Sequence, residues 1–293
     1  MRRMRIGGPL LLQALSVGAA LGCSSQDLSI GWQDVGTSDA SVGADAGKFV
    51  IIWRDDFGTL DPGRWEVAEH TFEENYADFS TANAVAEGGF LKLGVRVKPA
   101  GASGKPYTAA EVRTWATFVC GKFLVRSRIA PGSGLTSTLF GFHDFFQNAA
   151  AQDWNEIVME SSDPSRIDLV YTRENPALPG GKERVPAMAS VAFNATSDFH
   201  VYGFEWTPSE VRYLVDGAPL LSLPEAVARD LGRPKRIVMS AYPSTRLAPN
   251  RSFDPAVLPA EAWYDWIEVY RYTGSCPTGD DAGTSPDATG TAD

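Results

Sequence analysis

Short runs of alternating apolar and polar residues, separated by turn signals, recur through most of the 293-residue chain. A period of two is typical of a strand with one buried and one exposed face, and many such strands at close spacing indicate a β-sandwich or barrel. The sequence therefore predicts an all-β fold. After the opening run FVIIWRDDF at residue 49, strands are predicted at residues 88–97, 120–130, 133–144, 166–172, 199–206, 211–215, 236–242 and 266–272.

A helix and a tight hairpin are also predicted. The run EAVARDL follows a proline, which fits the first turn of a helix, so a helix is expected over residues 224–231. Asp216 and Gly217 separate two strand-like runs, and Asp-Gly favours a two-residue hairpin turn. Three tryptophans in strand patterns are expected in the core: Trp115, Trp206 and Trp266.

The two ends of the chain differ from its middle. Residues 24–48 and 274–293 are rich in Ser, Gly, Ala and Asp and have no sustained period, so a disordered linker and a disordered acidic tail are predicted. A single domain is therefore expected over residues 49–273, since one β-sandwich commonly reaches about 200–250 residues.

Residues 1–23 have the organisation of a signal peptide, with a basic start followed by an apolar run. The run is short and interrupted by glycines, which argues against a permanent membrane-spanning helix. Its ALGC ending resembles the lipobox of bacterial lipoproteins, in which Cys23 is lipidated; the alternative is ordinary signal cleavage. We expect a secreted protein or a cell-envelope lipoprotein of a bacterium, which reaches the membrane only through a lipid anchor.

The charge of the chain bears on its partners. Cleavage after residue 22 removes three of the 26 basic residues and leaves 23 against 36 acidic ones, a net charge of −13. Binding to phosphates needs clustered Lys and Arg, so the sequence disfavours nucleic acid as a partner. An acidic protein with eight Trp and nine Tyr fits a neutral polysaccharide better, and we expect a monomer.

The three cysteines form no metal-binding pattern. No CxxC motif or Cys/His cluster suggests a transition metal, and no cofactor is predicted to be required. If Cys23 carries a lipid, Cys120 and Cys276 could pair in an oxidising compartment, although the sequence cannot place them within bonding range.

The stretch DWNEIVMES carries two acids on one predicted strand face. Alternation puts Glu156, Val158 and Glu160 on one side, and Ile157 and Met159 on the other. Residues four apart on a strand have Cα atoms roughly 13 Å apart. Inward-leaning side chains on a curved strand could narrow that gap to the range of about 5–9.5 Å used in sugar hydrolysis. The alternative is an exposed strand face that happens to carry two glutamates.

Five segments between residues 53 and 272 follow one another in order: DDFGTLDPGRW, EVRTWATFVCGKFLVRSRI, WNEIVME, FHVYGFEWTPSEVRYLVDG and YDWIEVYRY. Taken together, they resemble glycoside hydrolase family 16, the lichenase and laminarinase superfamily. The resemblance implies a jelly-roll, concanavalin A-like sandwich of two curved antiparallel sheets, with a cleft across the concave face.

The resemblance also implies a reaction, an endo-β-glucanase-like cleavage of a β-linked polysaccharide by retaining double displacement. Glu156 matches the nucleophile and Glu160 the acid/base. The first carboxylate attacks the anomeric carbon while the second gives its proton to the leaving oxygen. For this exchange Glu160 needs a pKa raised by burial and by the neighbouring negative charge.

The sequence departs from the ExDxE pattern of the family at its centre, where Val158 replaces the aspartate. Valine cannot hydrogen-bond or orient the nucleophile. One hydrogen bond to a charged group contributes about 1.5–3 kcal/mol, or roughly ten- to a hundredfold in rate. A catalytically impaired carbohydrate-binding pseudoenzyme is therefore the alternative to a hydrolase, and a surface lipoprotein without a sugar ligand is a third possibility.

Aromatic and polar side chains are predicted to bind the sugar. Trp154 lies on the same strand face as the acids, and Tyr242 stands where lichenase-like proteins have a cleft Trp; the alternative for both is a place in the core. Glu111 and Arg113 match a substrate-contacting pair, which could otherwise be a surface ion pair of little energetic value. Asn83 is predicted to hydrogen-bond sugar hydroxyls.

Many members of the family bind calcium on the convex side. The matching positions are Asp265 and the backbone carbonyls of Asp56 and Gly89, and oxygen ligands are those that Ca²⁺ prefers. The resemblance thus implies a structural Ca²⁺, with Asp265 capping a turn as the alternative. His70 and His143 belong to no recognisable constellation.

Overall fold

The structure, a computed structural model, describes residues 47–143, 154–245 and 252–276. Cys23 with the predicted signal peptide, residues 24–46 of the predicted linker and residues 277–293 of the predicted tail lie outside the described residues. No helix among the described residues is long and apolar enough to cross a membrane.

Strands dominate the described part of the chain, as predicted. They are β1 (Phe49–Asp55), β2 (Trp65–Val67), β3 (Ala77–Phe79), β4 (Ala84–Glu87), β5 (Phe90–Val97), β6 (Tyr107–Thr114), β7 (Gly121–Arg128), β8 (Leu135–Phe142), β9 (Asn155–Asp163), β10 (Arg166–Glu174), β11 (Lys182–Ser190), β12 (His200–Trp206), β13 (Val211–Val215), β14 (Ala218–Leu223), β15 (Arg236–Pro243) and β16 (Ala260–Tyr272). The helices are short: η1 (Thr81–Asn83), α1 (Glu225–Asp230) and η3 (Pro255–Val257).

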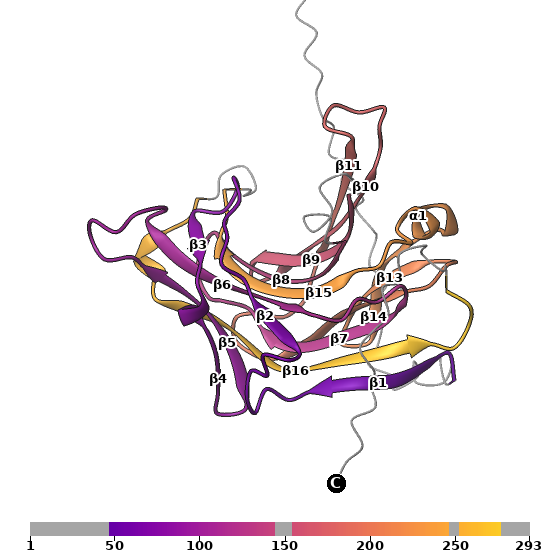
Figure 1. Cartoon of the computed structure of the whole chain (residues 1–293), viewed down its shortest axis with the longest axis horizontal. Helices are drawn as coiled ribbons and strands as arrows, with labels where there is room; N and C mark the ends of the chain where they lie inside the picture. The colour runs from indigo at the N-terminus through magenta and orange to yellow at the C-terminus, as the bar shows by residue number, and fades with distance from the viewer. Residues whose placement is uncertain (1–46, 144–153, 246–251, 277–293) are drawn as a thin grey trace, which may run out of the picture.

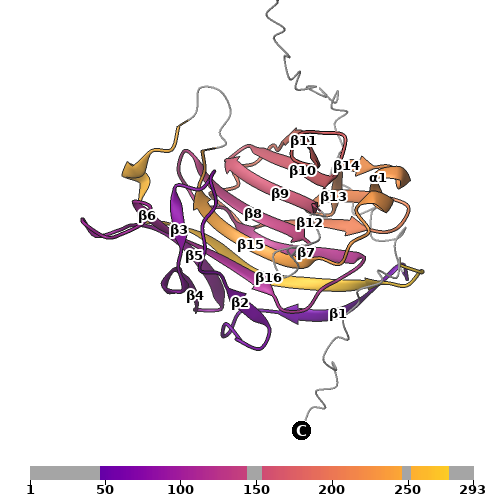
Figure 2. The same ribbon diagram turned by 45° about the horizontal axis from the view of Figure 1, so that its top comes forward.

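The strands form two curved layers that lie on each other, as Figure 1 shows. One layer runs β11-β10-β9-β8-β15-β6, and the other runs β14-β13-β12-β7-β16-β5, with a pairing of β5 and β6 that joins them. Every pairing is antiparallel except that of β3 with β6. Figure 2 shows β11, β10, β9, β8 and β15 side by side across one face. The jelly-roll sandwich expected from the sequence is thus confirmed.

The core between the layers also supports the floor of the cleft. Its largest buried side chains include Trp206, Tyr213 and Tyr264. The hydroxyl of Tyr213 donates to the backbone oxygen of Val170 at 2.7 Å, and that of Tyr264 donates to the backbone oxygen of Thr138 at 3.0 Å. These tyrosines come from one layer and hydrogen-bond to strands of the other. They therefore fix the distance of β8 and β10 from the opposite layer.

Several local predictions are confirmed. The predicted strand at 211–215 coincides with β13, and the predicted helix at 224–231 contains α1. Asp216 and Gly217 form the predicted hairpin turn between β13 and β14, with φ of 49° and 79°, values typical of a type I′ turn.

The prediction that Trp115 lies in the core is wrong. Its side chain is 51% exposed, whereas Trp206 is 1% exposed. Trp115 directly follows β6, and the alternation of that strand puts it on the same side as Glu111 and Arg113, which face the cleft. Its indole N–H donates to the backbone oxygen of Pro62 at 2.9 Å, which satisfies its one polar group.

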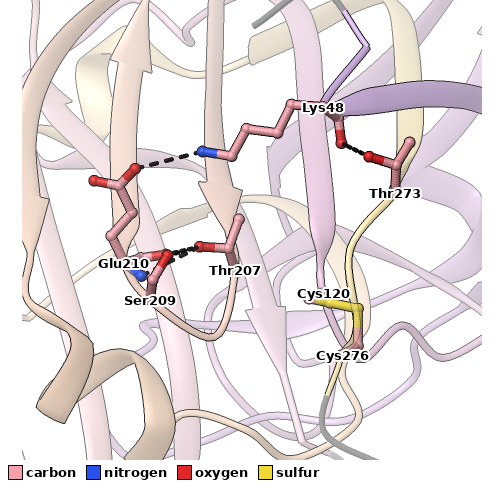
Figure 3. The surroundings of a disulfide bond; sticks show 7 residues. All are labelled: Lys48, Cys120, Thr207, Ser209, Glu210, Thr273 and Cys276. Carbon is pink, nitrogen blue, oxygen red and sulfur yellow. Dashed lines mark hydrogen bonds and ion pairs between the residues drawn. A yellow bond between two sulfur atoms is a disulfide. The ribbon is translucent and has the colours of Figure 1, made fainter.

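The pairing of Cys120 with Cys276, which the sequence left open, is present in the structure. Their Cα atoms lie 6.1 Å apart, and the bond joins the start of β7 to the chain just after β16 (Figure 3). Close by, Thr273 donates to the backbone oxygen of Lys48 at 3.1 Å (Figure 3). The hydrogen bond therefore links the beginning of the described chain to its end, and the disulfide links that end to the start of β7.

Candidate active site

A cleft with a volume of about 420 Å³ crosses the face of the layer that contains β9. Its floor comes from β6, β15, β8, β9 and β10, and its sides come from the segment after β2 and from β11. The lining residues are His70, Thr71, Phe72, Glu73, Glu74, Glu111, Arg113, Thr138, Phe140, Phe142, Trp154, Glu156, Val158, Glu160, Val170, Thr172, Lys182, Arg184, Val238, Ser240 and Tyr242.

Strand β9 presents its residues as the alternation predicts. Glu156, Val158 and Glu160 line the cleft and are half-buried. Ile157 and Met159 point into the core, where they are 0% and 2% exposed. Burial of these two side chains fixes the register of the strand, so both acids must face the cleft.

Val158 lies in an apolar row. Across the ladder it pairs with Phe140 of β8 and with Val170 of β10, and both of these residues also line the cleft. The neighbouring strands therefore place no polar side chain directly beside the position where the family has its aspartate. Apolar neighbours disfavour charge on a carboxyl group.

Glu160 has polar neighbours. It pairs with Thr138 on one side and with Asp168 on the other. From β11, Nη2 of Arg184 reaches across to lie 3.1 Å from Oε1 of Glu160. The hydroxyl of Thr138 is itself held by Ser240 at 2.7 Å.

Asp168 adds a further carboxylate to this row. Burial raises its pKa, and the guanidinium of Arg166, with Nε 3.1 Å from Oδ1, acts in the opposite direction. Nothing in the sequence distinguishes Asp168 from the other acids that lie on predicted strands.

Glu156 has different neighbours. It pairs with Phe142 and Thr172. On the core side of the sheet lies Lys235, which is 0% exposed. Burial lowers the pKa of Lys235 well below its ordinary value, while the charge of Glu156 acts to raise it.

The ammonium of Lys235 is held by three acceptors. It donates to the side chain of Asn155 and to the backbone oxygens of Leu231 and Arg233. It also lies 4.1 Å from the ring centroid of Trp206. Lys235 thus connects the start of β9 to the end of α1.

The two predicted aromatic residues both line the cleft. Tyr242 packs edge to face on Phe72 and Phe79, with ring centroids 5.2 and 6.1 Å apart. Trp154 has the ammonium of Lys182 at 3.6 Å from its ring centroid. One face of the indole therefore carries a cation at the place where a sugar ring would stack.

Glu111 and Arg113 form the expected pair, but it is not a surface ion pair. Glu111 is 4% exposed and accepts from Nε of Arg113 at 2.7 Å. His70 joins them, with Nε2 at 3.1 Å from Oε1 of Glu111. Sequence reasoning missed His70, because it lies 41 residues before its partner in an irregular segment.

Asn83 is not among the residues that line the cleft. It lies in η1, and its side chain donates to the backbone oxygen of Ala109 at 3.3 Å. A role in sugar binding therefore stays a prediction for this residue.

The predicted calcium ligands lie close to one another in the strand register. The pairing of β16 with β1 and β5 brings Asp265 near the end of β1 and the start of β5, where Asp56 and Gly89 lie. The carboxylate of Asp265, however, accepts a hydrogen bond from the guanidinium of Arg126. The guanidinium already neutralises the carboxylate that a Ca²⁺ ion would bind, so Asp265 fits the role of a metal ligand poorly.

Two carboxyl groups that face one cleft in a curved β-sandwich define the class of glycan-cleaving jelly rolls. Comparison with known proteins agrees. Residues 71–267 match the sequence pattern of the family described as Glycosyl hydrolases family 16, and the chain belongs to this family.

Relatives of known name are similar over much of the chain. The Beta-glucanase of Rhodothermus marinus is 29% identical over 252 residues, which cover 76% of this chain and 85% of that protein. The Beta-glucanase of Fibrobacter succinogenes is 28% identical over 173 residues, which cover 58% of this chain but only 49% of the relative. The chain thus spans most of the first relative and about half of the second.

Solved structures confirm the fold. A lichenase derived from a mouse hindgut metagenome has a TM-score of 0.62 at 23% identity, with 74% of this chain and 97% of that chain covered. The laminarinase from Rhodothermus marinus has a TM-score of 0.65 at 24% identity, with 77% and 98% covered.

Proposed function

We propose that this protein is a secreted hydrolase that cleaves a β-linked glucan with retention of configuration. The observation that carries the proposal is the placement of Glu156 and Glu160 on the cleft face of β9, in a chain that belongs to family 16. Relatives named Beta-glucanase support a β-glucan as the substrate class.

The two acids have complementary roles in the proposed reaction. Glu156 attacks the anomeric carbon while the bond from that carbon to the leaving oxygen breaks, and the proton of Glu160 goes to this oxygen. Water then attacks the glycosyl-enzyme and gives a proton back to Glu160, which frees Glu156. Glu111, Arg113, Trp154 and Tyr242 line the cleft and are proposed to bind the sugar chain.

Sugar release tests this proposal directly. Reducing ends should be measured on lichenan, laminarin, agarose and xyloglucan with the wild type and with Glu156→Gln. We expect release from at least one β-glucan by the wild type and none above background by the variant. Equal release by both proteins would contradict the assignment of Glu156.

A second candidate function is glycan binding without turnover. The apolar row around Val158 favours it, because the proposed nucleophile lacks the central polar neighbour of the family pattern. Binding of lichenan or laminarin in an affinity gel, with no reducing ends released, would support this function. Absence of binding to every glycan on an array would support a structural lipoprotein instead.

Export and anchoring are part of the proposal. Cys23 is proposed as a lipidation site, with simple secretion as the alternative. Wild type and Cys23→Ser should be expressed in a bacterium with a radiolabelled fatty acid. Label in the membrane fraction of the wild type alone would support the anchor, and label in neither would leave ordinary signal cleavage. Light scattering after gel filtration tests the proposed monomer.

A structural Ca²⁺ at Asp265 remains a proposal, in competition with the guanidinium of Arg126. The thermal midpoint of the protein should be compared in millimolar Ca²⁺ and in EDTA, with Asp265→Asn as the control. A rise with Ca²⁺ that the control lacks would support the site. An equal midpoint in both solutions would mean that Arg126 alone neutralises Asp265.

A further inference from the structure

Arg184 contacts the acid that has to donate a proton. It lies on β11, the edge strand of the layer, and its Nη2 is 3.1 Å from Oε1 of Glu160. A guanidinium at this distance favours the ionised carboxylate. In the first step of the proposed reaction, however, Glu160 must carry the proton that goes to the leaving oxygen.

The other groups that face Glu160 balance this cation only in part. On β9 itself, the negative charge of Glu156 opposes ionisation of Glu160. On β10, Asp168 acts in the same direction, but it is paired with Arg166 and its own pKa is raised by burial. Asp168 therefore opposes ionisation of Glu160 less than a fully charged carboxylate would.

Two further neighbours of Glu160 are neutral. Thr138 of β8 is neutral and is hydrogen-bonded to Ser240. On the core side, Glu160 and Tyr202 both line a small cavity of about 20 Å³. Burial raises the pKa of Tyr202 far above its ordinary value, so its hydroxyl is neutral.

We propose that Arg184 is a positioning residue: it contacts Glu160 in the free enzyme, favours loss of its proton, and has to release this carboxyl before the proton passes to the leaving oxygen. This inference rests on the proposed function. The side chain of Arg184 is 35% exposed and extends from an edge strand, so it can leave Glu160 without any change in the sheet. A sugar whose leaving oxygen displaces Arg184 from Glu160 would allow this carboxyl to take up a proton from water and pass it to that oxygen.

The proposal has a consequence for the dependence of activity on pH. The profile of kcat/KM against pH reports the ionisation of groups in the free enzyme. Because Arg184 favours loss of the proton from Glu160, activity falls at a lower pH than it would without this arginine. An opposite charge beside a carboxylate lowers its pKa by about 1–3 units.

The test compares three variants. Arg184→Met removes the charge, Arg184→Lys keeps it, and Arg173→Met removes a charge from the same hairpin, where Arg173 pairs with Glu183. We expect the alkaline limb of kcat/KM to move up by about one pH unit in Arg184→Met, which is about fivefold in rate one unit above the wild-type midpoint and approaches about tenfold at higher pH. Arg184→Lys and Arg173→Met should stay close to the wild type. An unchanged limb in Arg184→Met, or an equal shift in Arg173→Met, would overturn the proposal.

A second measurement does not require turnover. The carboxyl carbons of glutamate can be labelled with ¹³C and titrated by NMR, with Glu160→Gln used to assign the signal. The midpoint of Glu160 should rise in Arg184→Met and not in Arg173→Met. If the wild type hydrolyses no glucan but the midpoint rises, only the proposed hydrolase function fails. If the midpoint of Glu160 is the same in the wild type and in folded Arg184→Met, the role of Arg184 is wrong.

Discussion

Glu156 and Glu160 point from one strand into one cleft, but the protein surrounds them differently. Glu156 lies in a row with Phe142 and Thr172, and the strand register continues this row to Arg184 of β11. Glu160 lies in a row with Asp168 and is contacted by Arg184 from the side. Arg184 thus stands in the row of the first acid and contacts the second.

The layers beneath the two acids differ as well. Below the start of β9, Lys235 and Asn155 form hydrogen bonds that join the strand to the end of α1. Beside Glu160 the core contains the small cavity, and the hydroxyl of Tyr202 has no hydrogen-bond partner in the described part of the chain. The first acid is therefore on a tightly held segment, as a nucleophile requires, whereas the second has room to adjust as it gains and loses a proton.

The largest effects should come from the acids themselves, and the substrate can separate their roles. On a β-glucan, Glu156→Gln and Glu160→Gln should each lower kcat by at least about 10²–10⁴-fold. On an oligosaccharide with a leaving group that needs no proton, Glu160→Gln should regain its first step, because protonation no longer limits it. Glu156→Gln should stay inactive.

The measurement is the initial burst of leaving group with each variant. A burst in Glu160→Gln and none in Glu156→Gln is the expected result. The opposite pattern would exchange the two roles, and the comparison of their surroundings would then have to be reversed.

The next effect concerns the residue between the acids. Val158→Asp should raise kcat on a β-glucan by about ten- to a hundredfold, since a hydrogen bond to a charged group contributes about 1.5–3 kcal/mol. Val158→Asn is the matched control, because it brings hydrogen bonding without charge. The new side chain lies between Phe140 and Val170, so thermal midpoints should be recorded for both variants.

A folded Val158→Asp with unchanged kcat would show that the centre of the strand does not limit the reaction. In that case the apolar row is part of a working site. The contrast between the two acids would then rest on Arg184 and Lys235 alone.

The sequence predicted the floor of the cleft better than its sides. Alternation alone placed Glu156, Val158 and Glu160 correctly, because Ile157 and Met159 leave no other face for the core. The pairing of strands sets what lies beside these residues, and single-strand patterns do not contain this information. Phe140 and Asp168 could therefore not be predicted as neighbours of Val158 and Glu160.

Strand β11 was not predicted, and its two cleft cations were missed with it. Its sequence KERVPAMAS contains Pro186, which argues against a central strand. The structure shows why a proline is tolerated in this strand. β11 pairs only with β10 and lies at the edge of the layer, where a backbone N–H is not needed for a second pairing. Lys182 and Arg184 thus belong to a strand that the usual signals do not reveal.

A third prediction tests whether the segment below Glu156 is as firmly held as its contacts suggest. Lys235→Met leaves the acceptors on Asn155, Leu231 and Arg233 without their donor. Unsatisfied buried groups cost about 1–3 kcal/mol each, and since the segment can relax in part, we expect a loss of about 2–4 kcal/mol in the free energy of unfolding. Urea unfolding of Lys235→Met and of the control Lys182→Met measures this difference. Equal midpoints for the two variants would mean that Lys235 does not hold the strand.

The smallest expected effect concerns Asp168 and depends on pH. Burial raises the pKa of Asp168 in the folded protein, so the folded state holds this proton more tightly than the unfolded chain does. The resulting contribution to stability is complete below the ordinary pKa near 3.8 and is lost as the pH rises through the raised value. Asp168→Asn removes this dependence, so its thermal midpoint should exceed that of the wild type slightly at pH 7 and match it below about pH 4. The exposed Asp198→Asn is the control, and a midpoint of Asp168→Asn below the wild type at pH 7 would mean that the pair with Arg166 outweighs the cost of burial.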